Sequence, residues 1–160
     1  MLDSIGFYGP IIIAALNIYY SFYKKTYLYA YVIFLVINQI LNHTLKSILR
    51  EPRPNDEHKY DKYGMPSGHA QSIFYSTTFL YLTTASYYLL IISLFICALT
   101  IYQRYHFRHH TLKQLFIGSL VGIGIGSFVY QISKYYITTK TKYHDNINDD
   151  IDDELHATEI

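Results

Sequence analysis

Apolar residues along the chain gather in long runs that short polar stretches separate. A helix needs about 20 mainly apolar residues to cross the hydrocarbon core of a bilayer, and five of the runs have that character. The pattern therefore predicts an all-α, polytopic membrane bundle of about five transmembrane helices. We expect them over residues 5–23, 26–49, 67–85, 86–103 and 111–137.

The polar stretches indicate where these helices end. Residues 50–66 include two prolines that flank Arg53, and a proline biases the residue before it toward extended backbone, so this stretch is a loop. Residues 104–110 read RYHFRHH and are too charged for hydrocarbon. The runs 67–85 and 86–103 adjoin each other, which predicts a helical hairpin with a very short turn.

Composition separates a membrane domain from a polar tail. Hydrophobic residues make up 51% of the chain, and the 19 tyrosines suit the membrane–water interface. Seven of the twelve acidic residues lie beyond Tyr143. We predict a transmembrane domain over residues 1–138 and a polar acidic tail, mostly disordered, over residues 139–160. The net charge of +1 supports no nucleic-acid face, and the single Cys97 excludes an intrachain disulfide.

Three polar clusters fall on the same surface of such a bundle. Successive helices cross the bilayer in opposite directions, so the second helix ends, the third begins, the fourth ends and the fifth begins at one surface. This brings together the loop with Lys46 and Arg53, the PSGH sequence at residues 66–69 and residues 104–110. The coincidence predicts a functional site there.

The PSGH sequence is typical of a helix that begins at an anion-binding site. Pro66 suits the entry to a helix, Ser67 is a good N-cap, and Gly68 lets a ligand approach the backbone. The N–H groups of a first helical turn bind phosphate readily. His69 beside them suits proton donation, because imidazole titrates near neutral pH. The alternative is a capped helix with an interfacial histidine.

Lys46, Arg53 and Arg104 supply positive charge to the same surface. Arg53 is held between two prolines, and a guanidinium group binds phosphate oxygens in a set geometry. Arg104 is a second candidate clamp of this kind. Plainer explanations stay open: Lys46 lies near a helix end, where its ammonium group can reach the interface, and Arg53 can simply face water.

His106, His109 and His110 compete for the role of nucleophile or base where the fifth helix begins. Three histidines in five residues also raise the possibility of a metal site, which usually needs a further ligand. The acids on this face all lie in the preceding loop: Glu51, Asp56, Glu57 and Asp61. We therefore expect no metal. Two histidines, three cations and a helix N-terminus suit phosphoryl transfer through a covalent intermediate on histidine.

These residues resemble the three signature motifs of the type 2 phosphatidic acid phosphatase (PAP2) superfamily. The motifs read Lys-x6-Arg-Pro, Pro-Ser-Gly-His and Ser-Arg-x5-His-x3-Asp. Residues 46–54, 66–69 and 104–110 match them in order and in spacing, and the resemblance covers about residues 41–126. It implies a helical bundle of the PAP2/haloperoxidase-like type, although the core of that superfamily commonly has six helices and this chain has five.

The resemblance implies a role for each residue. His110 would be the nucleophile and His69 the general acid. Gln114 stands where the superfamily has an aspartate that holds the nucleophile, and Gln103 replaces the serine before the arginine. A neutral amide accepts the same hydrogen bond but gives less charge stabilisation, so Gln114 leaves open a slow or silent protein. The phosphate-binding residues would be Lys46, Arg53, Ser67, Gly68 and Arg104.

The dolichyl diphosphate phosphatase branch is similar beyond these motifs. It carries His-Thr-x-x-Gln, as residues 110–114 do, and KYGMPS with a glutamine at the position of Gln71; Gly68 instead follows the broader superfamily. The resemblance implies a metal-independent, cofactor-free lipid phosphatase that acts on a polyprenyl (dolichyl) diphosphate in the bilayer. The alternatives are phosphatidate or another lipid phosphate as substrate, and a catalytically silent lipid-binding or scaffold protein.

The membrane orientation follows from the resemblance alone. With the three proposed phosphate-binding cations set aside, five lysine and arginine residues lie at each surface, so the positive-inside rule does not decide the orientation. The dolichyl branch implies an endoplasmic reticulum membrane, with the site toward the lumen and the tail in the cytosol.

Two further patterns concern packing. Small residues recur every four positions in the fifth helix, which predicts close helix contact in lipid: Gly118, Gly122 and Gly126. Asn38 and Asn42 lie within the second helix, where polar side chains usually face the bundle interior. His43 beside them either lines the path of the lipid or makes an interhelical hydrogen bond.

Overall fold

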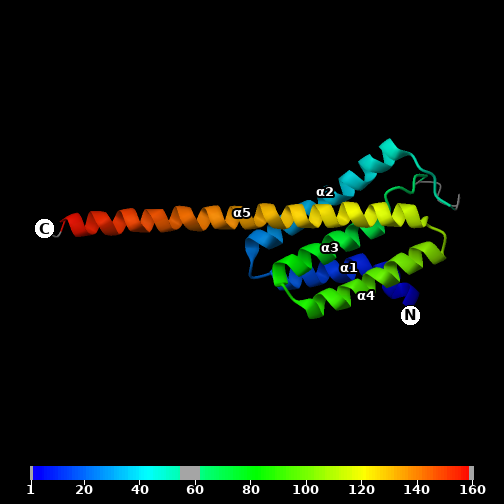
Figure 1. Ribbon diagram of the computed structural model, residues 1–160, viewed down its shortest axis with the longest axis horizontal. Coiled ribbons are helices and arrows are strands. Elements are labelled where there is room, and N and C mark those ends of the chain that lie inside the picture. Colours follow the sequence, from blue (N-terminus) through cyan, green and yellow to red (C-terminus); the bar gives the residue numbers. More distant parts are fainter. Residues whose placement is uncertain (1, 55–61, 159–160) are drawn as a thin grey trace.

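Over the residues that the structure describes, the chain folds into five α-helices (Figure 1). The structure is a computed structural model and describes residues 2–54 and 62–158, with side chains over 4–54 and 62–143. Apart from the end of the last helix, every helix begins and ends within three residues of its predicted bounds. The helices are α1 (Leu2–Ser21), α2 (Lys25–Leu49), α3 (Gly68–Thr84), α4 (Tyr87–His106) and α5 (Leu112–Thr158).

The central helix of the bundle is α3. It contacts each of the other four helices, while α1 also packs on α4 and α2 on α5. Ala85 and Ser86 alone separate α3 from α4, which confirms the short hairpin turn. In Figure 1 the ends of α2 and α4 and the beginnings of α3 and α5 lie together at the right of the bundle. The topology predicted from alternating crossings is therefore confirmed.

Glycines set the distance between α3 and α5. A Cβ atom at Gly118, Gly122 or Gly126 would lie 2.6, 2.3 and 2.8 Å from a backbone oxygen of α3 or its N-cap, closer than van der Waals contact allows. The oxygens belong to Ser67, Gln71 and Tyr75, in that order. Gly124 faces open space. The spacing of four residues thus marks a helix–helix contact, as predicted.

The buried core has two parts on opposite sides of α3. The first is aliphatic, joins α1, α3 and α4, and contains Cys97, which packs there as a small hydrophobic side chain. The second is aromatic and joins α2, α3 and α5. In it the rings of Tyr31 and Tyr75 stack with centroids 5.2 Å apart, and the Tyr31 hydroxyl hydrogen-bonds Ser76 Oγ at 2.8 Å. Both parts hold α3 in place.

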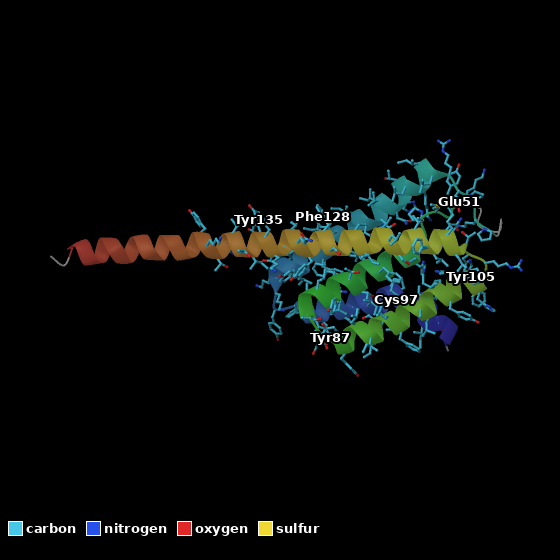
Figure 2. All side chains as sticks on the ribbon, in the orientation of Figure 1. Glu51, Tyr87, Cys97, Tyr105, Phe128 and Tyr135 are labelled. Carbon is cyan, nitrogen blue, oxygen red and sulfur yellow. The ribbon has the colours of Figure 1, made fainter. Side chains whose placement is uncertain are left out.

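The outer surface of the bundle is apolar. Large exposed side chains include Tyr87 and Tyr105 near the two ends of α4, and Phe128 and Tyr135 on α5 (Figure 2). Within the described residues, three helices are long and apolar enough to cross a membrane: α2, α4 and Leu112–Tyr143 of α5. We predicted about five such spans. The short α3, of 17 residues, instead buries polar side chains among its neighbours.

The last helix continues well beyond the bundle (Figure 1). It runs to Thr158, whereas the sequence predicted a mostly disordered tail from residue 139. A helix extends at low cost once its preceding turn is formed, and the residues after Ile137 include no proline or glycine to stop it. The acidic segment therefore prolongs α5.

Candidate active site

A cavity of about 1040 Å³ opens at the end of the bundle where the three polar clusters meet. Its lining includes residues from the end of α2, the beginning of α3 and the end of α4, and Figure 1 shows these helix ends on the same side of the bundle. Ser67 and Gln114 are buried beside it. The other six predicted site residues line it: Lys46, Arg53, Gly68, His69, Arg104 and His110. The structure thus brings together three clusters, whose first and last residues, Lys46 and His110, are more than sixty positions apart in the sequence.

Ser67 caps α3, as the sequence predicts. Its backbone is extended (φ −66°, ψ 119°), and its hydroxyl accepts a hydrogen bond from the N–H of Ala70 at 3.5 Å. Its own N–H donates to the carbonyl of Gln114 at 3.1 Å, which ties the start of α3 to α5. A Cβ at Gly68 would lie 3.1 Å from Asn42 Oδ1. The N-terminus of α3 is therefore held at the cavity by its neighbours.

A buried network of amides lies beneath this helix start. The amide nitrogen of Asn42 donates to Gln71 Oε1 at 2.8 Å and to the carbonyl of Pro66 at 3.2 Å. Gln71 in turn donates to Asn38 Oδ1 at 2.9 Å. Asn38 and Asn42 therefore face the bundle interior, as predicted, and they support the backbone that carries His69. No pattern in the sequence marks Gln71 as the partner of these two asparagines.

The contacts of His110 define which ring nitrogen carries the proton. Nδ1 lies 3.0 Å from the carbonyl of Gly64 and 3.2 Å from Gln114 Oε1. Both are acceptors, so Nδ1 is protonated and donates. Nε2 lies 3.3 Å from Nη1 of Arg53, which can only donate, so Nε2 keeps its lone pair. An imidazole with this tautomer presents a nucleophilic Nε2 to the cavity.

Burial and positive neighbours keep that ring neutral. Burial lowers the pKa of His110 to about 3, with a further contribution from the charge of Arg53. The imidazole is consequently neutral at neutral pH, with its single proton on Nδ1, and this is the form that can attack phosphorus. A bound phosphate would offset the surrounding positive charge.

The loop between α2 and α3 positions both Arg53 and Gly64. The N–H of Gly64 donates to the carbonyl of Glu51 at 2.8 Å, and Pro52 pairs with Tyr63 in an isolated antiparallel bridge. Nη1 of Arg53 reaches the carbonyl of His109 at 3.3 Å. Of the acidic loop residues considered as metal ligands, Asp56, Glu57 and Asp61 lie outside the described residues, and the described part contains no cluster of histidine, cysteine and acidic side chains suited to a metal.

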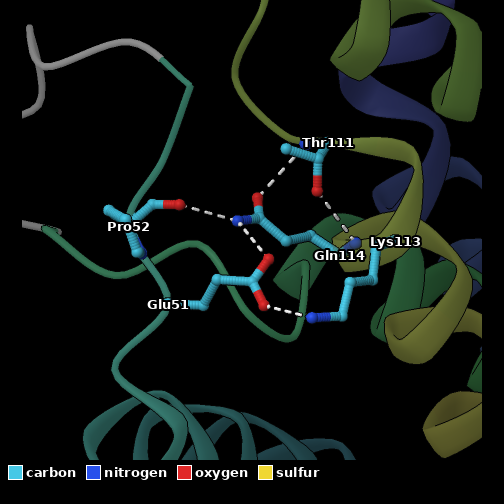
Figure 3. Close-up of polar contacts among 5 residues, drawn as sticks. All are labelled: Glu51, Pro52, Thr111, Lys113 and Gln114. Carbon is cyan, nitrogen blue, oxygen red and sulfur yellow. Dashed lines mark hydrogen bonds and ion pairs between the residues drawn. The ribbon is translucent and has the colours of Figure 1, made fainter.

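Gln114 connects His110 to the loop, and Figure 3 shows its contacts with Thr111, Pro52 and Glu51. Its Oε1 accepts from His110 and, at 3.2 Å, from the N–H of Thr111. Its Nε2 donates to the carbonyl of Pro52 at 2.8 Å and to Glu51 Oε1 at 3.3 Å. The amide thus makes the hydrogen bond to Nδ1 that the superfamily aspartate was expected to make.

His69 and Arg104 contact each other in the wall of the cavity. Nη2 of Arg104 contacts Nε2 of His69, and the ring of Phe7 lies 5.0 Å from the Arg104 guanidinium carbon and 5.6 Å from the His69 ring. Nε of Arg104 is buried without a hydrogen-bond partner among the described residues. The part played by Phe7 was not predicted, because a phenylalanine in an apolar run gives no separate signal.

The histidines near His110 in the sequence or in the cavity are less buried than His110. His106 is exposed and stacks on Tyr102 with centroids 5.4 Å apart. His109 and His43 line the cavity. The ring of His110 is the buried one among the three rivals, and its Nδ1 is held by two acceptors. The geometry therefore favours His110 as the nucleophile.

Part of the cavity wall is apolar. Besides Phe7, which packs on His69, its apolar residues come from α1 and α2: Pro10, Ile11, Ala14, Leu35 and Val36. A site that combines charged residues with an apolar wall suits a ligand with a phosphate head and a hydrocarbon chain.

Comparison with known proteins decides the family. Residues 26–137, which contain all eight predicted site residues, match the PAP2 superfamily. The chain belongs to the PAP2 superfamily. Among solved structures, this PAP2 protein resembles a transmembrane PAP2 type phosphatidylglycerolphosphate phosphatase from Bacillus subtilis, with a TM-score of 0.67 and 19% identity over 84% of this chain and 75% of that one. That likeness shows a common fold.

Two curated proteins are similar to this PAP2 chain in sequence. Dolichyldiphosphatase 1 of Dictyostelium discoideum is 36% identical over an alignment of 114 residues that covers 63% of this chain and 50% of the relative. A palmitoyl-protein thioesterase–dolichyl pyrophosphate phosphatase fusion protein of Schizosaccharomyces pombe is 32% identical over an alignment of 124 residues that covers 68% of this chain and 19% of the relative. The chain therefore spans half of the first relative and a smaller part of the second.

Proposed function

We propose that the protein is an integral-membrane phosphatase that hydrolyses a polyprenyl diphosphate, dolichyl diphosphate in particular, through a phosphohistidine on His110. The observation that carries the proposal is the orientation of His110. Two acceptors hold its protonated Nδ1, and its Nε2 lone pair lies at a cavity lined by Lys46, Arg53 and Arg104. A silent lipid-binding protein has no need of a nucleophile held in this way.

In the proposed first step, the terminal phosphate lies among the three cations, which stabilise charge on its oxygens. The lone pair of His110 Nε2 attacks the terminal phosphorus and forms a P–N bond. The P–O bond to the lipid monophosphate breaks, and its electron pair stays on the departing oxygen. A bound phosphate takes over the Arg104 donor that His69 accepts in the structure, so the released His69 nitrogen takes up a proton from solvent and gives this proton to the departing oxygen.

The second step regenerates the enzyme. Neutral His69 accepts a proton from a water molecule, whose oxygen attacks the phosphorus. The P–N bond breaks, its electrons return to Nε2 of His110, and inorganic phosphate leaves. The charge on the cations and on the N-terminus of α3 stabilises both transition states, so the proposed chemistry requires no metal.

The lipid and the membrane are further parts of the proposal. The names of the two curated relatives support dolichyl diphosphate, and the apolar residues of α1 and α2 offer a surface for the isoprenoid chain. The same resemblance supports the endoplasmic reticulum, with the site toward the lumen. Phosphatidate is the competing substrate.

The test measures phosphate release by the detergent-purified protein in EDTA, from dolichyl diphosphate and from phosphatidate. We expect faster release from dolichyl diphosphate, and loss of release in His110→Ala. The matched control is His106→Ala, because that exposed side chain stacks on Tyr102 away from the proposed chemistry. Equal rates on the two lipids would overturn the substrate, and release that survives in His110→Ala would overturn the phosphohistidine.

A further inference from the structure

Glu51 lies two hydrogen bonds from the ring of His110, and Figure 3 shows the bond between Gln114 and Glu51. The first bond joins His110 Nδ1 to Gln114 Oε1 at 3.2 Å, and the second joins Gln114 Nε2 to Glu51 Oε1 at 3.3 Å. The chain thus continues from the imidazole through a neutral amide to a carboxylate. Neither the motif nor its spacing assigned a role to Glu51.

The amide of Gln114 does not need Glu51 for its orientation. The N–H of Thr111 donates to Oε1 at 3.2 Å, and the carbonyl of Pro52 accepts from Nε2 at 2.8 Å. A backbone N–H can only donate and a backbone carbonyl can only accept, so these two groups already determine which way the amide points. Glu51 therefore contributes something else, and the property that a carboxylate has and an amide lacks is negative charge.

We propose that Glu51 supplies, through Gln114, the negative charge that stabilises the ring of His110 when phosphoryl transfer makes it positive. The ring gains this charge because Nε2 gives its lone pair to phosphorus while Nδ1 keeps its proton. Gln114 passes the polarisation on, since its Nε2–H points at the carboxylate and its Oε1 at the imidazole. Glu51 is thus a positioning residue that acts at a distance, and its role rests on the proposed phosphohistidine.

Lys113 holds the carboxylate and also weakens its field. Its Nζ lies 2.8 Å from Glu51 Oε2, so this ion pair turns Oε1 toward Gln114. The hydrogen bond from Lys113 lowers the pKa of Glu51 and keeps it ionised at neutral pH. Lys113 is 68% exposed, so water screens its charge, whereas the Glu51 side chain is 25% exposed. The two members of the pair should therefore act on His110 in opposite directions.

The expected effect can be estimated from charge and distance. A unit charge two hydrogen bonds away, on the order of 8 Å, changes the rate of a charge-forming step by about 10- to 30-fold at the effective dielectric constant of a protein. Because the charge on the ring appears only in the transition state and intermediate, the loss should fall on kcat and leave KM nearly unchanged.

The experiment compares Glu51→Gln with Lys113→Gln in the full chain. Glu51→Gln keeps an oxygen that can accept from Gln114 and removes only the charge. We expect its kcat to fall about tenfold, with KM within about twofold, while Lys113→Gln keeps the wild-type kcat or exceeds it. The double variant Glu51→Gln/Gln114→Glu moves the carboxylate next to His110 and should recover rate relative to Glu51→Gln.

Orthovanadate binding provides a readout that needs no lipid. Vanadium takes the five-coordinate geometry of the transferring phosphorus and bonds to an imidazole nitrogen, so its affinity follows the charge stabilisation at the ring. Glu51→Gln should weaken vanadate binding by the same factor as kcat, and leave the binding of inorganic phosphate unchanged.

Each outcome is decisive. An unchanged kcat and vanadate affinity in Glu51→Gln would overturn the role of Glu51. Equal losses in Glu51→Gln and Lys113→Gln would show that the ion pair merely clamps the loop to α5, and would also overturn it. Absence of hydrolysis by the wild-type chain on every lipid would overturn the proposed function instead, and the vanadate comparison would still decide whether Glu51 acts on His110.

Discussion

Replacing Gly122 by alanine tests the packing that joins the two halves of the site. The added Cβ would lie 2.3 Å from the carbonyl oxygen of Gln71 and 2.9 Å from the N–H nitrogen of Tyr75, where ordinary contact begins at 3.4 Å. Both are backbone atoms of α3, so α3 and α5 must separate by about 1 Å at this point. Overpacking of this kind costs about 1–3 kcal/mol.

Gly124→Ala is the matched control. It lies on the same helix and a Cβ there meets nothing within 4 Å. Alanine is favoured over glycine in a helix interior by about 1 kcal/mol, so Gly124→Ala should be more stable than wild type. Gly122→Ala has the same gain in helix propensity, but it also loses the close contact between α3 and α5. The two variants should therefore differ by about 2 kcal/mol, or about 4–8 °C in melting temperature for a chain of this size.

The assay is thermal unfolding of both variants in one detergent, followed by their phosphatase activity at a temperature where both are folded. Gly122→Ala should also lose activity, because the same contact aligns the start of α3 with α5, where the N–H of Ser67 meets the carbonyl of Gln114. A Gly122→Ala protein that melts at or above Gly124→Ala would refute the close approach of the two helices.

Two further predictions concern His110. Gly64→Ala should lower kcat and change KM less, because the added Cβ would lie 2.4 Å from Gln114 Oε1 and would displace the amide from the His110 ring. Steady-state kinetics beside wild type checks this, and an unchanged kcat would contradict it. Folding stability should fall as pH decreases from about 6.5 toward 4, because the pKa of His110 is lowered to about 3 and only the unfolded chain takes up the proton there. His110→Asn should flatten the melting temperature over that range relative to wild type, and identical profiles would exclude this contribution.

The helices and the position of the site could be predicted because they depend on local patterns. Apolar runs and the prolines around Arg53 define where α2 ends, and Ser67 marks the start of α3 through its capping chemistry. Alternation of the helices then requires Lys46, His69 and Arg104 to meet at one end. The chemical roles of these residues stay predictions until they are assayed.

The contacts that complete the site could not be predicted, because they depend on distant backbone groups. The carbonyl of Gly64 holds His110 from 46 positions away, and no side-chain pattern marks a carbonyl. Phe7 reaches His69 and Arg104 only because α1 packs on α3 and α4. The helical continuation of α5 was not predicted, because the composition of residues 139–160 does not indicate that a preceding helix can extend through them.

The first helix has a consequence for how this protein can diverge. The PAP2 match begins at residue 26, after α1 has ended, yet α1 contributes Phe7, Pro10, Ile11 and Ala14 to the cavity wall. The proposed nucleophile, acid and cations all lie outside that helix. Substitutions of Pro10, Ile11 or Ala14 can therefore reshape the apolar wall without altering the proposed catalytic residues, provided that Phe7 keeps its contacts with His69 and Arg104. A chimaera that exchanges α1 between relatives offers a route to a new lipid preference on an unchanged catalytic centre.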